Sequence, residues 1–386
     1  MLFYMFKITR CLSEKVKNKF YGFYPKCVIF ATTQRLNIMH QKYPQKSYTV
    51  LMVCYFLSIL FSSCNNSPNP IKIDTSKITI PYQSIRFDSI LFQCDTNHLD
   101  AAIENLYQTY PEFTSTYFNS ITGFSNTEDK TIFINAVRHF LTYKDYKGLM
   151  DTVRFHFPTT KSIDQELIDL LKHIRYYYPN RKLGKVYYFV SGLNYWSAVT
   201  VDTCIGVGLD MYLGVDYPFY QSVQIPQYQI NRCDKKYITV NVSKAIYEDM
   251  HPFNADGKSL LELCIQRGKE MLFTEYTLPD KKIELLFGYS EKQLEWCEKN
   301  EALIWNYFTK TKLLYSTQWQ EMLRYVNDGP NSTGMPPESP GNIGTWIGWK
   351  IAHQYLEKHP EMTWKDFVEK DINAQNIIQE ADYRPR

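Results

Sequence analysis

One strongly apolar run near the N-terminus, from Tyr48 to Phe61, most constrains how this chain folds. Its fourteen residues are too few to span a bilayer as a helix, because a transmembrane helix needs roughly 20 residues. The run has the length of a signal-peptide core instead, and Lys42 and Lys46 supply the positive flank that precedes such a core. The sequence therefore predicts an exported chain that loses its leader.

The residues directly after the run predict where the leader is cut. Ser62 and Ser63 precede Cys64, and this order resembles a lipobox, at which the signal peptide is cleaved and the new N-terminal cysteine receives diacylglycerol. Phe61 stands where Leu is commoner in a lipobox. The alternative is a short membrane anchor or a buried helix that happens to precede a cysteine. We favour lipidation of Cys64 because a polar, Pro-rich segment that buries no apolar surface comes after it.

These features divide the chain into four parts. Met39 begins a signal peptide of conventional length, so the residues before it are interpreted as a start-site extension. The expected parts are the extension 1–38, the signal peptide 39–63, a flexible tether 64–80 and a single domain 81–386. Within that domain we expect a helical lobe over 98–180 and a lobe with sheet and helices over 181–386.

The charge of the remaining chain argues against a nucleic-acid partner. Residues 1–64 carry nine of the 43 Lys and Arg residues and one of the 40 Asp and Glu residues. Their removal leaves 34 basic and 39 acidic residues, so the net charge changes from +3 to −5. A nucleic-acid-binding protein needs a basic face, and none is indicated. The five cysteines after Cys64 are widely spaced and are expected to be mostly buried free thiols, with one disulfide left open.

The periodicity of apolar residues predicts an α+β fold that is mostly helical, with a small central antiparallel sheet. An extended segment is expected at 82–95, and strands are expected at 186–190, 204–211 and 237–242. Helices are expected at 99–118, 128–142, 146–155 and 164–177, then from Ser259 to Phe273, after the capping box of Ser290 and Gln293, and after Thr363 with Asp366. The segment Gly329–Gly341 is rich in Pro and Gly and is expected to be a loop.

No standard catalytic motif is present in the sequence. The H-E-x-x-H zinc motif, the G-x-S-x-G elbow, the Walker loop and the dinucleotide-binding G-x-G-x-x-G are all missing. The nearest approach to a zinc motif is Tyr247–His251, in which Tyr stands in place of the first histidine and Pro252 comes directly after. A solvated helix end is the favoured interpretation of Glu248 and His251 there.

Three segments stand out instead, namely the 204–211 strand, the helix that contains Gly268 and the segment 338–350. Gly206 and Gly208 share one face of the 204–211 strand with Asp210, which indicates that backbone or a ligand approaches closely there. Gly268 interrupts a helix and predicts close helix packing. Small residues at helical spacing after Gly344 also predict core packing, and Ser339 to Gly341 offer an alternative anion site at a helix entrance.

Several stretches resemble the gliding-motility lipoprotein GldB family of Bacteroidetes. They are Gly206–Gly214, Arg267–Lys269, Asn300–Glu301, Ile304–Trp305, Glu338–Gly341 and Gly344–Tyr355. The resemblance implies an envelope lipoprotein associated with gliding and the linked type IX secretion apparatus. It also implies a core similar to gluzincin-type zinc peptidases, with 205–213 as the peptide-receiving edge strand and 259–273 as the helix that carries the third metal ligand. Because the two-histidine motif is missing, the resemblance implies a scaffold without an active metal site.

We therefore predict a non-catalytic envelope component that binds a protein partner, with no cofactor beyond the lipid on Cys64. The anchor is expected in the outer membrane, facing the periplasm. The predicted cleft or binding residues are Gly206, Gly208, Asp210, Arg267, Lys269, Glu338, Ser339, Gly341 and Trp346. Gly208→Val and Asp210→Ala are expected to weaken partner binding without unfolding the chain.

Two other functions remain open. One is a metal-dependent, peptidase-like hydrolase with a non-standard site that uses Glu262, Glu338, His251 or His353. The other is a capture protein for peptide or glycan, indicated by Trp346, Trp349 and the 31 Tyr residues.

Overall fold

The computed structural model describes residues 73–125, 129–371 and 373–385. The predicted extension, the signal peptide, Cys64 and the first part of the tether lie outside these residues. Within the described part, no helix is both long and apolar enough to cross a membrane.

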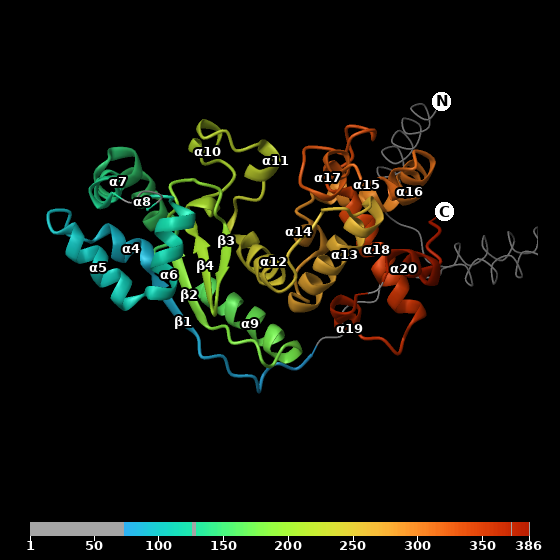
Figure 1. The fold of residues 1–386 in the computed structure, drawn as a ribbon, viewed down its shortest axis with the longest axis horizontal. Coiled ribbons are helices and arrows are strands. Elements are labelled where there is room, and N and C mark those ends of the chain that lie inside the picture. The colour runs from blue at the N-terminus through green and yellow to red at the C-terminus, as the bar shows by residue number, and fades with distance from the viewer. Residues whose placement is uncertain (1–72, 126–128, 372, 386) are drawn as a thin grey trace, which may run out of the picture. The chain divides into compact units, whose positions relative to one another are not determined.

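A four-stranded sheet lies at the centre of the first half of the described chain (Figure 1). Its strands are β1 (Gln83–Arg86), β2 (Lys185–Phe189), β3 (Ala198–Val201) and β4 (Cys204–Gly208), in the order β1-β2-β4-β3. β2 pairs in parallel with both β1 and β4, and only β3 and β4 are antiparallel. The prediction of a small sheet in a mostly helical α+β fold is confirmed, but the sheet is mixed and the antiparallel prediction was wrong.

Helices cover both faces of this sheet. Tyr187 and Tyr188 are neighbours on β2, so their side chains point to opposite faces. The Tyr187 ring stacks on Phe113 of α6 (Pro111–Thr116), with ring centroids 4.5 Å apart. The Tyr188 hydroxyl donates to Asp164 of α9 (Lys161–Tyr177) over 2.7 Å. Burial on both faces explains why β2 is a continuous run of large apolar and aromatic residues and does not alternate.

The helices of the first half follow the predicted ones with one break. They are α4 (Phe87–Phe92), α5 (Leu99–Thr109), α6 (Pro111–Thr116), a π-helical segment (Tyr117–Ile121), α7 (Lys130–Thr142), α8 (Lys144–His156) and α9 (Lys161–Tyr177). The predicted helix 99–118 is interrupted at Tyr110, because the next residue is Pro111, which has no backbone N–H and begins a new helix. The extended segment expected at 82–95 is a strand only to Arg86 and then forms α4.

The strand predicted at 237–242 was wrong. Tyr237 ends a 3₁₀ turn (Lys235–Tyr237), and α12 (Ile238–Met250) begins at the next residue. Asp234 starts this helical stretch by accepting a hydrogen bond from the Lys236 amide. Val240 and Val242 favour a strand locally, but packing of α12 against β3, α9 and α13 prevails over that preference.

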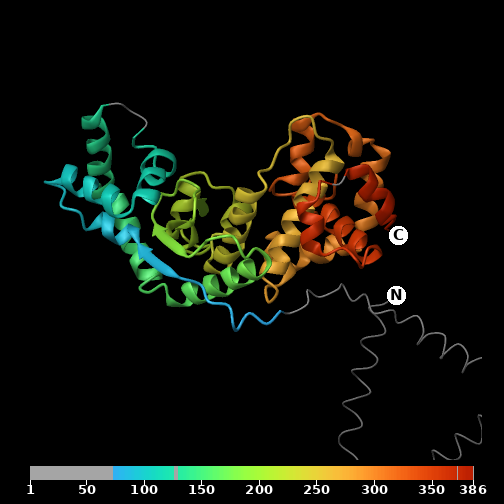
Figure 2. The same ribbon diagram turned by 60° about the horizontal axis from the view of Figure 1, so that its bottom comes forward.

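The C-terminal helices gather on the side of α12 that faces away from the sheet (Figure 2). After the short α10 (Phe219–Ser222) and α11 (Gln227–Ile230), they are α13 (Leu260–Thr277), α14 (Ile283–Phe287), α15 (Glu291–Lys299), α16 (Glu301–Lys310), α17 (Trp319–Val326), α18 (Ile343–Lys358), α19 (Trp364–Glu369) and α20 (Ala374–Ala381). The predicted capping box of Ser290 with Gln293 is present, and Ser259, where a helix was expected to begin, forms a further one with Glu262. The Thr363 hydroxyl caps α19 through the Asp366 amide. The five cysteines of the described chain are free, and all except Cys94 are buried.

Helices α13 and α18 cross with their backbones in contact. A Cβ atom built on Gly268 would collide with the carbonyl group of Gly348, and one built on Gly348 would collide with the carbonyl group of Cys264. Gly344, one turn earlier on α18, lies against the Tyr325 carbonyl and the Cys264 thiol. The prediction that these glycines serve close helix packing is confirmed.

This crossing leads to a stability prediction. Gly348→Ala should lower the free energy of unfolding by about 3 kcal/mol, because the added methyl group has to push the two backbones apart. Gly148→Ala is the matched control, since a Cβ at Gly148 of α8 meets nothing within 4 Å. It should raise stability by about 0.5–1 kcal/mol through helix propensity. Chemical denaturation of the two variants tests this, and equal midpoints would contradict the crossing.

Candidate functional site

A cavity of about 280 Å³ lies between α12, α13 and the end of α19 with the two residues that follow it. α12 lines it with Tyr247 and Glu248, and the loop that ends α12 lines it with His251 to Phe253. α13 contributes Arg267 and Glu270, and residues 368–371 form the opposite wall. Charged and polar side chains from three separate parts of the chain therefore meet around one space.

Three lining residues carry buried polar atoms that make no hydrogen bond to the described chain. They are Nε2 of His251, Oε1 of Gln266 and Nε of Arg267. The His251 nitrogen lies 3.3 Å from a carboxylate oxygen of Glu369. A buried polar atom without a partner typically costs about 1–3 kcal/mol, so folded proteins contain few of them. Three around one cavity mark it as a place where a polar ligand gains hydrogen bonds.

Arg267 is held at the inner side of this cavity by several contacts. Its Nη1 donates to Glu270 over 2.7 Å and lies 3.9 Å from the carboxylate of Glu248. Its Nη2 lies 3.5 Å from the side-chain oxygen of Asn327. The guanidinium carbon stands 3.9 Å from the ring centre of Phe253, which is cation–π geometry. These contacts fix the guanidinium plane and leave its Nε unpaired.

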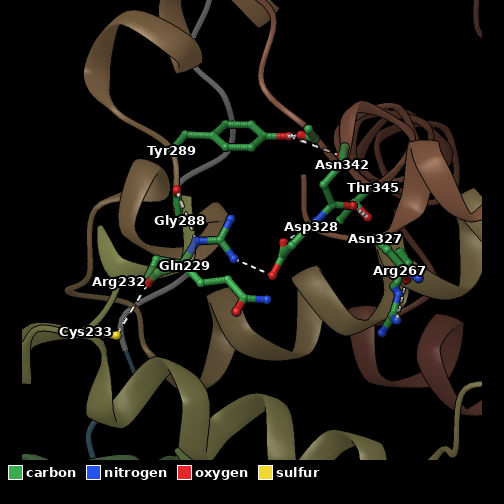
Figure 3. Close-up of polar contacts among 11 residues, drawn as sticks. Gln229, Arg232, Cys233, Arg267, Gly288, Tyr289, Asn327, Asp328, Asn342 and Thr345 are labelled. Atoms are coloured by element: carbon green, nitrogen blue, oxygen red, sulfur yellow. Dashed lines mark hydrogen bonds and ion pairs between the residues drawn. The ribbon is translucent and has the colours of Figure 1, made fainter. Parts of the chain in front are cut away.

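A second arginine approaches the same region from the loop after α11. Arg232 donates through Nη1 to Asp328 over 2.5 Å and through Nε to the Gly288 carbonyl over 3.3 Å. Asp328 comes directly after Asn327, the partner of Arg267, so the two arginines lie on either side of one short loop segment (Figure 3). Asn327 and Asp328 directly precede the Pro- and Gly-rich loop that was predicted at 329–341.

Tyr289 and Asn342 hold the far end of that loop. The Tyr289 hydroxyl lies 3.1 Å from the carbonyl oxygens of Gly341 and Asn342 and donates to them (Figure 3). The Asn342 side-chain amide lies 3.5 Å from Asp328. Gly341 leaves no room for a side chain, because a Cβ there would collide with the backbone of Gly329. The two ends of the loop are thereby closed on each other.

Lys244 of α12 completes a set of three basic residues, Arg232, Lys244 and Arg267, that we call the cationic cluster. Burial lowers the pKa of Lys244. The negative charges of Glu270 and Asp328 act to raise it, and the positive charges of Arg232 and Arg267 act to lower it. Burial alone would raise the pKa of Asp328, but Arg232, Lys244 and Arg267 together lower it. The cluster is therefore electrostatically connected, and Asp328 is held ionised.

The model of the family described as Gliding motility protein GldB matches residues 68–385. The chain belongs to this family. No curated protein and no solved structure shows significant similarity to it. The match spans the sheet, α12, α13 and the loop that bears Asp328, so both the cavity and the cationic cluster lie within the GldB-type domain.

The predicted site residues of this GldB family member fall into separate places. Arg267 lines the cavity. Lys269 also lines it and holds its opposite wall, because its Nζ donates to the carbonyl oxygens of Val368 and Lys370 over 3.2 and 2.7 Å. Burial lowers the pKa of Lys269. Glu338 is exposed on the loop, and Ser339 is buried there, 3.4 Å from the Ser332 amide. Trp346 is buried in the core beside Phe287.

The glycines of β4 serve packing within the sheet. β4 lies between β2 and β3, so it is an inner strand and not the edge strand expected for 205–213. A Cβ on Gly206 would come within 2.8 Å of Val199 and 2.9 Å of Phe113, and one on Gly208 would collide with the Trp196 carbonyl. Neighbouring side chains and backbone therefore fill the space that the sequence left open to a ligand. Gly208→Val should consequently disturb the fold, in contrast to the expectation from sequence.

Asp210 holds a tight turn after β2. Its Oδ2 accepts from the Ser191 amide, the Ser191 hydroxyl and the Leu193 amide over 3.0, 2.9 and 2.7 Å. Leu193 has a φ of +64°, a conformation that a side chain with a Cβ rarely adopts. Burial raises the pKa of Asp210, and its Oδ1 makes no hydrogen bond to the described chain.

The residues considered for a hydrolase are dispersed. Glu262 caps α13, and Glu338 is exposed. His353 lies in the core, where its Nε2 and the Trp349 indole N–H are each 2.8 Å from Glu275. Of these four residues, only His251 lines the cavity, together with Glu248. Across the described residues, no group of three or more His, Cys, Asp or Glu side chains is arranged to hold a metal ion.

The sequence did not single out Arg232, Lys244 or Asp328. A signal for Lys244 was present, since it lies four residues after Val240 and three before Tyr247, and both of these are buried. Helical spacing places all three on one face. Because a strand was predicted at 237–242, this helix face was not recognised.

The role of Asp210 gives a pH-dependent prediction. A raised folded-state pKa means that the folded protein binds the proton more tightly, so stability falls as pH rises from the unfolded pKa through the folded one. Asp210→Asn removes this dependence and keeps an acceptor oxygen, whereas Asp210→Ala leaves three donors unpaired and should cost about 2 kcal/mol or more. Denaturation of the wild type and both variants between pH 4 and 7 measures this. Parallel pH profiles for wild type and Asp210→Asn would contradict it.

Proposed function

We propose that this GldB family member is a lipid-anchored, non-catalytic component of the cell envelope that binds another envelope protein. It is cut before Cys64, carries diacylglycerol lipid on that cysteine and faces the periplasm from the outer membrane. The family match supports the association with gliding motility. The apolar run, the small residues before Cys64 and the polar tether support the anchor.

The observation that carries the binding function is the cavity with three unpaired buried polar atoms. Gln266 and Arg267 each offer an atom that makes no hydrogen bond within the described chain, and His251 offers Nε2, which makes no hydrogen bond there but lies 3.3 Å from the carboxylate of Glu369. Lys269 donates to backbone carbonyl groups of the wall formed by 368–371, and His251 forms an ion pair with Glu369 in the same wall. A polar segment of a partner that enters here would satisfy these atoms. We therefore place the binding site at the cavity, in place of the cleft beside β4 that the sequence suggested.

The hydrolase alternative has less support. Its four candidate residues are split between a helix cap, an exposed loop, the core and the cavity, and only His251 lines the cavity. Metal analysis of the purified full-length protein distinguishes the two functions, because stoichiometric zinc would favour the hydrolase.

The lipid anchor predicts the effect of Cys64→Ser. Without the thiol no lipid is attached, and the protein should leave the membrane fraction or remain as an uncut precursor. Fractionation of cells with detection of the tagged full-length chain measures this. Substitution of Cys94, which is only partly buried, with Ser is the control and should leave the protein with the membrane. Membrane retention of mature-sized Cys64→Ser protein would contradict the anchor.

The cavity predicts where a partner can be crosslinked. Lys370 is exposed on the rim, and a photoactivatable residue in its place should capture an envelope protein in living cells. The same residue in place of Lys310, which is exposed at the end of α16, should capture nothing. Mass spectrometry of the purified adducts identifies the partner. Equal capture at both positions, or capture at Lys310 alone, would contradict the cavity as binding site.

A further inference from the structure

A second hollow adjoins the cavity and continues it along α13. Its volume is about 320 Å³. Gln266, Lys269 and Asp371 line both the cavity and this hollow, so the two spaces meet at these side chains. Lys258 and Glu262 line the second hollow alone, towards the start of α13. We call the cavity and the second hollow together the α13 groove.

The α13 groove is long enough for several residues of an extended chain. Along α13 its lining reaches from Glu262 to Glu270, which are eight residues apart. A helix rises about 1.5 Å per residue, so this stretch is about 12 Å long. An extended chain advances about 3.3 Å per residue, so about four residues of a bound segment would lie along it.

The lining of the α13 groove is polar and carries charges of both signs. Sites for lipids and small molecules are typically lined by apolar and aromatic side chains. Here five acidic and four basic residues of the described chain form most of the lining. Tyr247 is buried, and the Arg267 guanidinium lies 3.9 Å from the ring centre of Phe253, which leaves little aromatic surface for a sugar ring. This lining suits a polypeptide of mixed charge.

Two atoms of the groove match the hydrogen-bonding groups of a peptide backbone. Oε1 of Gln266 is a buried acceptor, and Nε of Arg267 is a buried donor, and neither has a partner in the described chain. Each residue of a polypeptide other than proline carries one N–H donor and one C=O acceptor, and an isolated extended segment uses neither internally. Gln266 also lies where the cavity and the second hollow meet.

We propose that the α13 groove binds an extended segment of the partner chain, with Gln266 accepting a hydrogen bond from a backbone amide of that segment and Arg267 donating to a backbone carbonyl oxygen. This inference rests on the proposed binding function and names the form in which the partner is bound. A folded partner surface would reach the cavity only, whereas an extended segment continues past Gln266 into the second hollow.

Peptide probes test this proposal on the full-length, lipidated protein in detergent. Pentaglycine, blocked by an acetyl group and a dimethylamide, is the first probe. Pentasarcosine with the same blocking groups is its matched control, because a methyl group replaces every backbone N–H. Maltopentaose represents a linear glycan. Ligand-observed NMR titration should show binding of pentaglycine only. Equal binding of both pentapeptides, binding of maltopentaose alone or binding of no probe would overturn the peptide site.

A substitution of Gln266 tests the predicted hydrogen bond. Gln266→Met keeps the length of the side chain and removes the acceptor, so it should weaken pentaglycine binding about fivefold to tenfold. Its melting temperature should not fall, because the lost atom has no partner in the described chain. Gln108→Met is the matched control, since Gln108 is exposed on α5, and it should bind as the wild type. Unchanged binding by Gln266→Met would overturn the assignment.

Crosslinking in living cells separates failure of this inference from failure of the proposed function. A photoactivatable residue in place of Lys258 probes the second hollow, and loss of the surface pair of Lys258 with Glu262 should cost little stability. It should capture the same partner as position 370, at sites within about ten residues of each other in the partner sequence.

The pattern of capture at the two positions decides between the two failures. Capture at position 370 without capture at position 258, or capture at distant sites of the partner, would mean that the cavity binds a partner but the extended segment is wrong. If position 370 captures nothing, the proposed function itself fails.

Discussion

The contact between Gly268 and Gly348 is the constraint on which the C-terminal half depends. Two helix backbones approach so closely there that neither glycine can carry a Cβ atom. Such an approach gives many dispersion contacts over a small area, and it holds α13 and α18 in one crossing position. α13 in turn packs against α9, α12, α17 and α19, so the position of this one helix determines how the sheet-bearing half meets the C-terminal helices.

The same contact explains how the candidate site is formed. Successive residues on a helix project about 100° apart, so the two neighbours of Gly268 diverge on either side of the crossing. Arg267 projects to the cavity and to Asn327, whereas Lys269 reaches the carbonyl groups of Val368 and Lys370. One basic residue therefore contributes to the cationic cluster, and the other holds the opposite wall of the cavity. Binding residues and core packing are thus adjacent in the sequence because one helix serves both.

The sequence predicted the parts of this structure that depend on local chemistry. The helix start at Ser259, the capping box at Ser290, the loop after Gly329 and the glycine packing of α13 could all be predicted, because each depends on the backbone needs of a few neighbouring residues. The strand directions and the helix at 238–250 could not be predicted, because both depend on packing against residues far away in the sequence. The cationic cluster was missed for the same reason: Arg232, Lys244 and Arg267 are far apart in the sequence, and only the fold brings their charges together.

The cationic cluster and the turn at Asp210 show how differently this chain treats its buried charges. Asp210 accepts three hydrogen bonds from a turn that needs them, and these offset part of the cost of its burial, which still raises its pKa. Lys244 is half-buried on α12, where the negative charges of Glu270 and Asp328 oppose the effects of burial and of the two arginines on its pKa. Both groups therefore depend on neighbours that the fold brings together, Asp210 on hydrogen bonds from one turn and Lys244 on carboxylates from α13 and from the loop after α17.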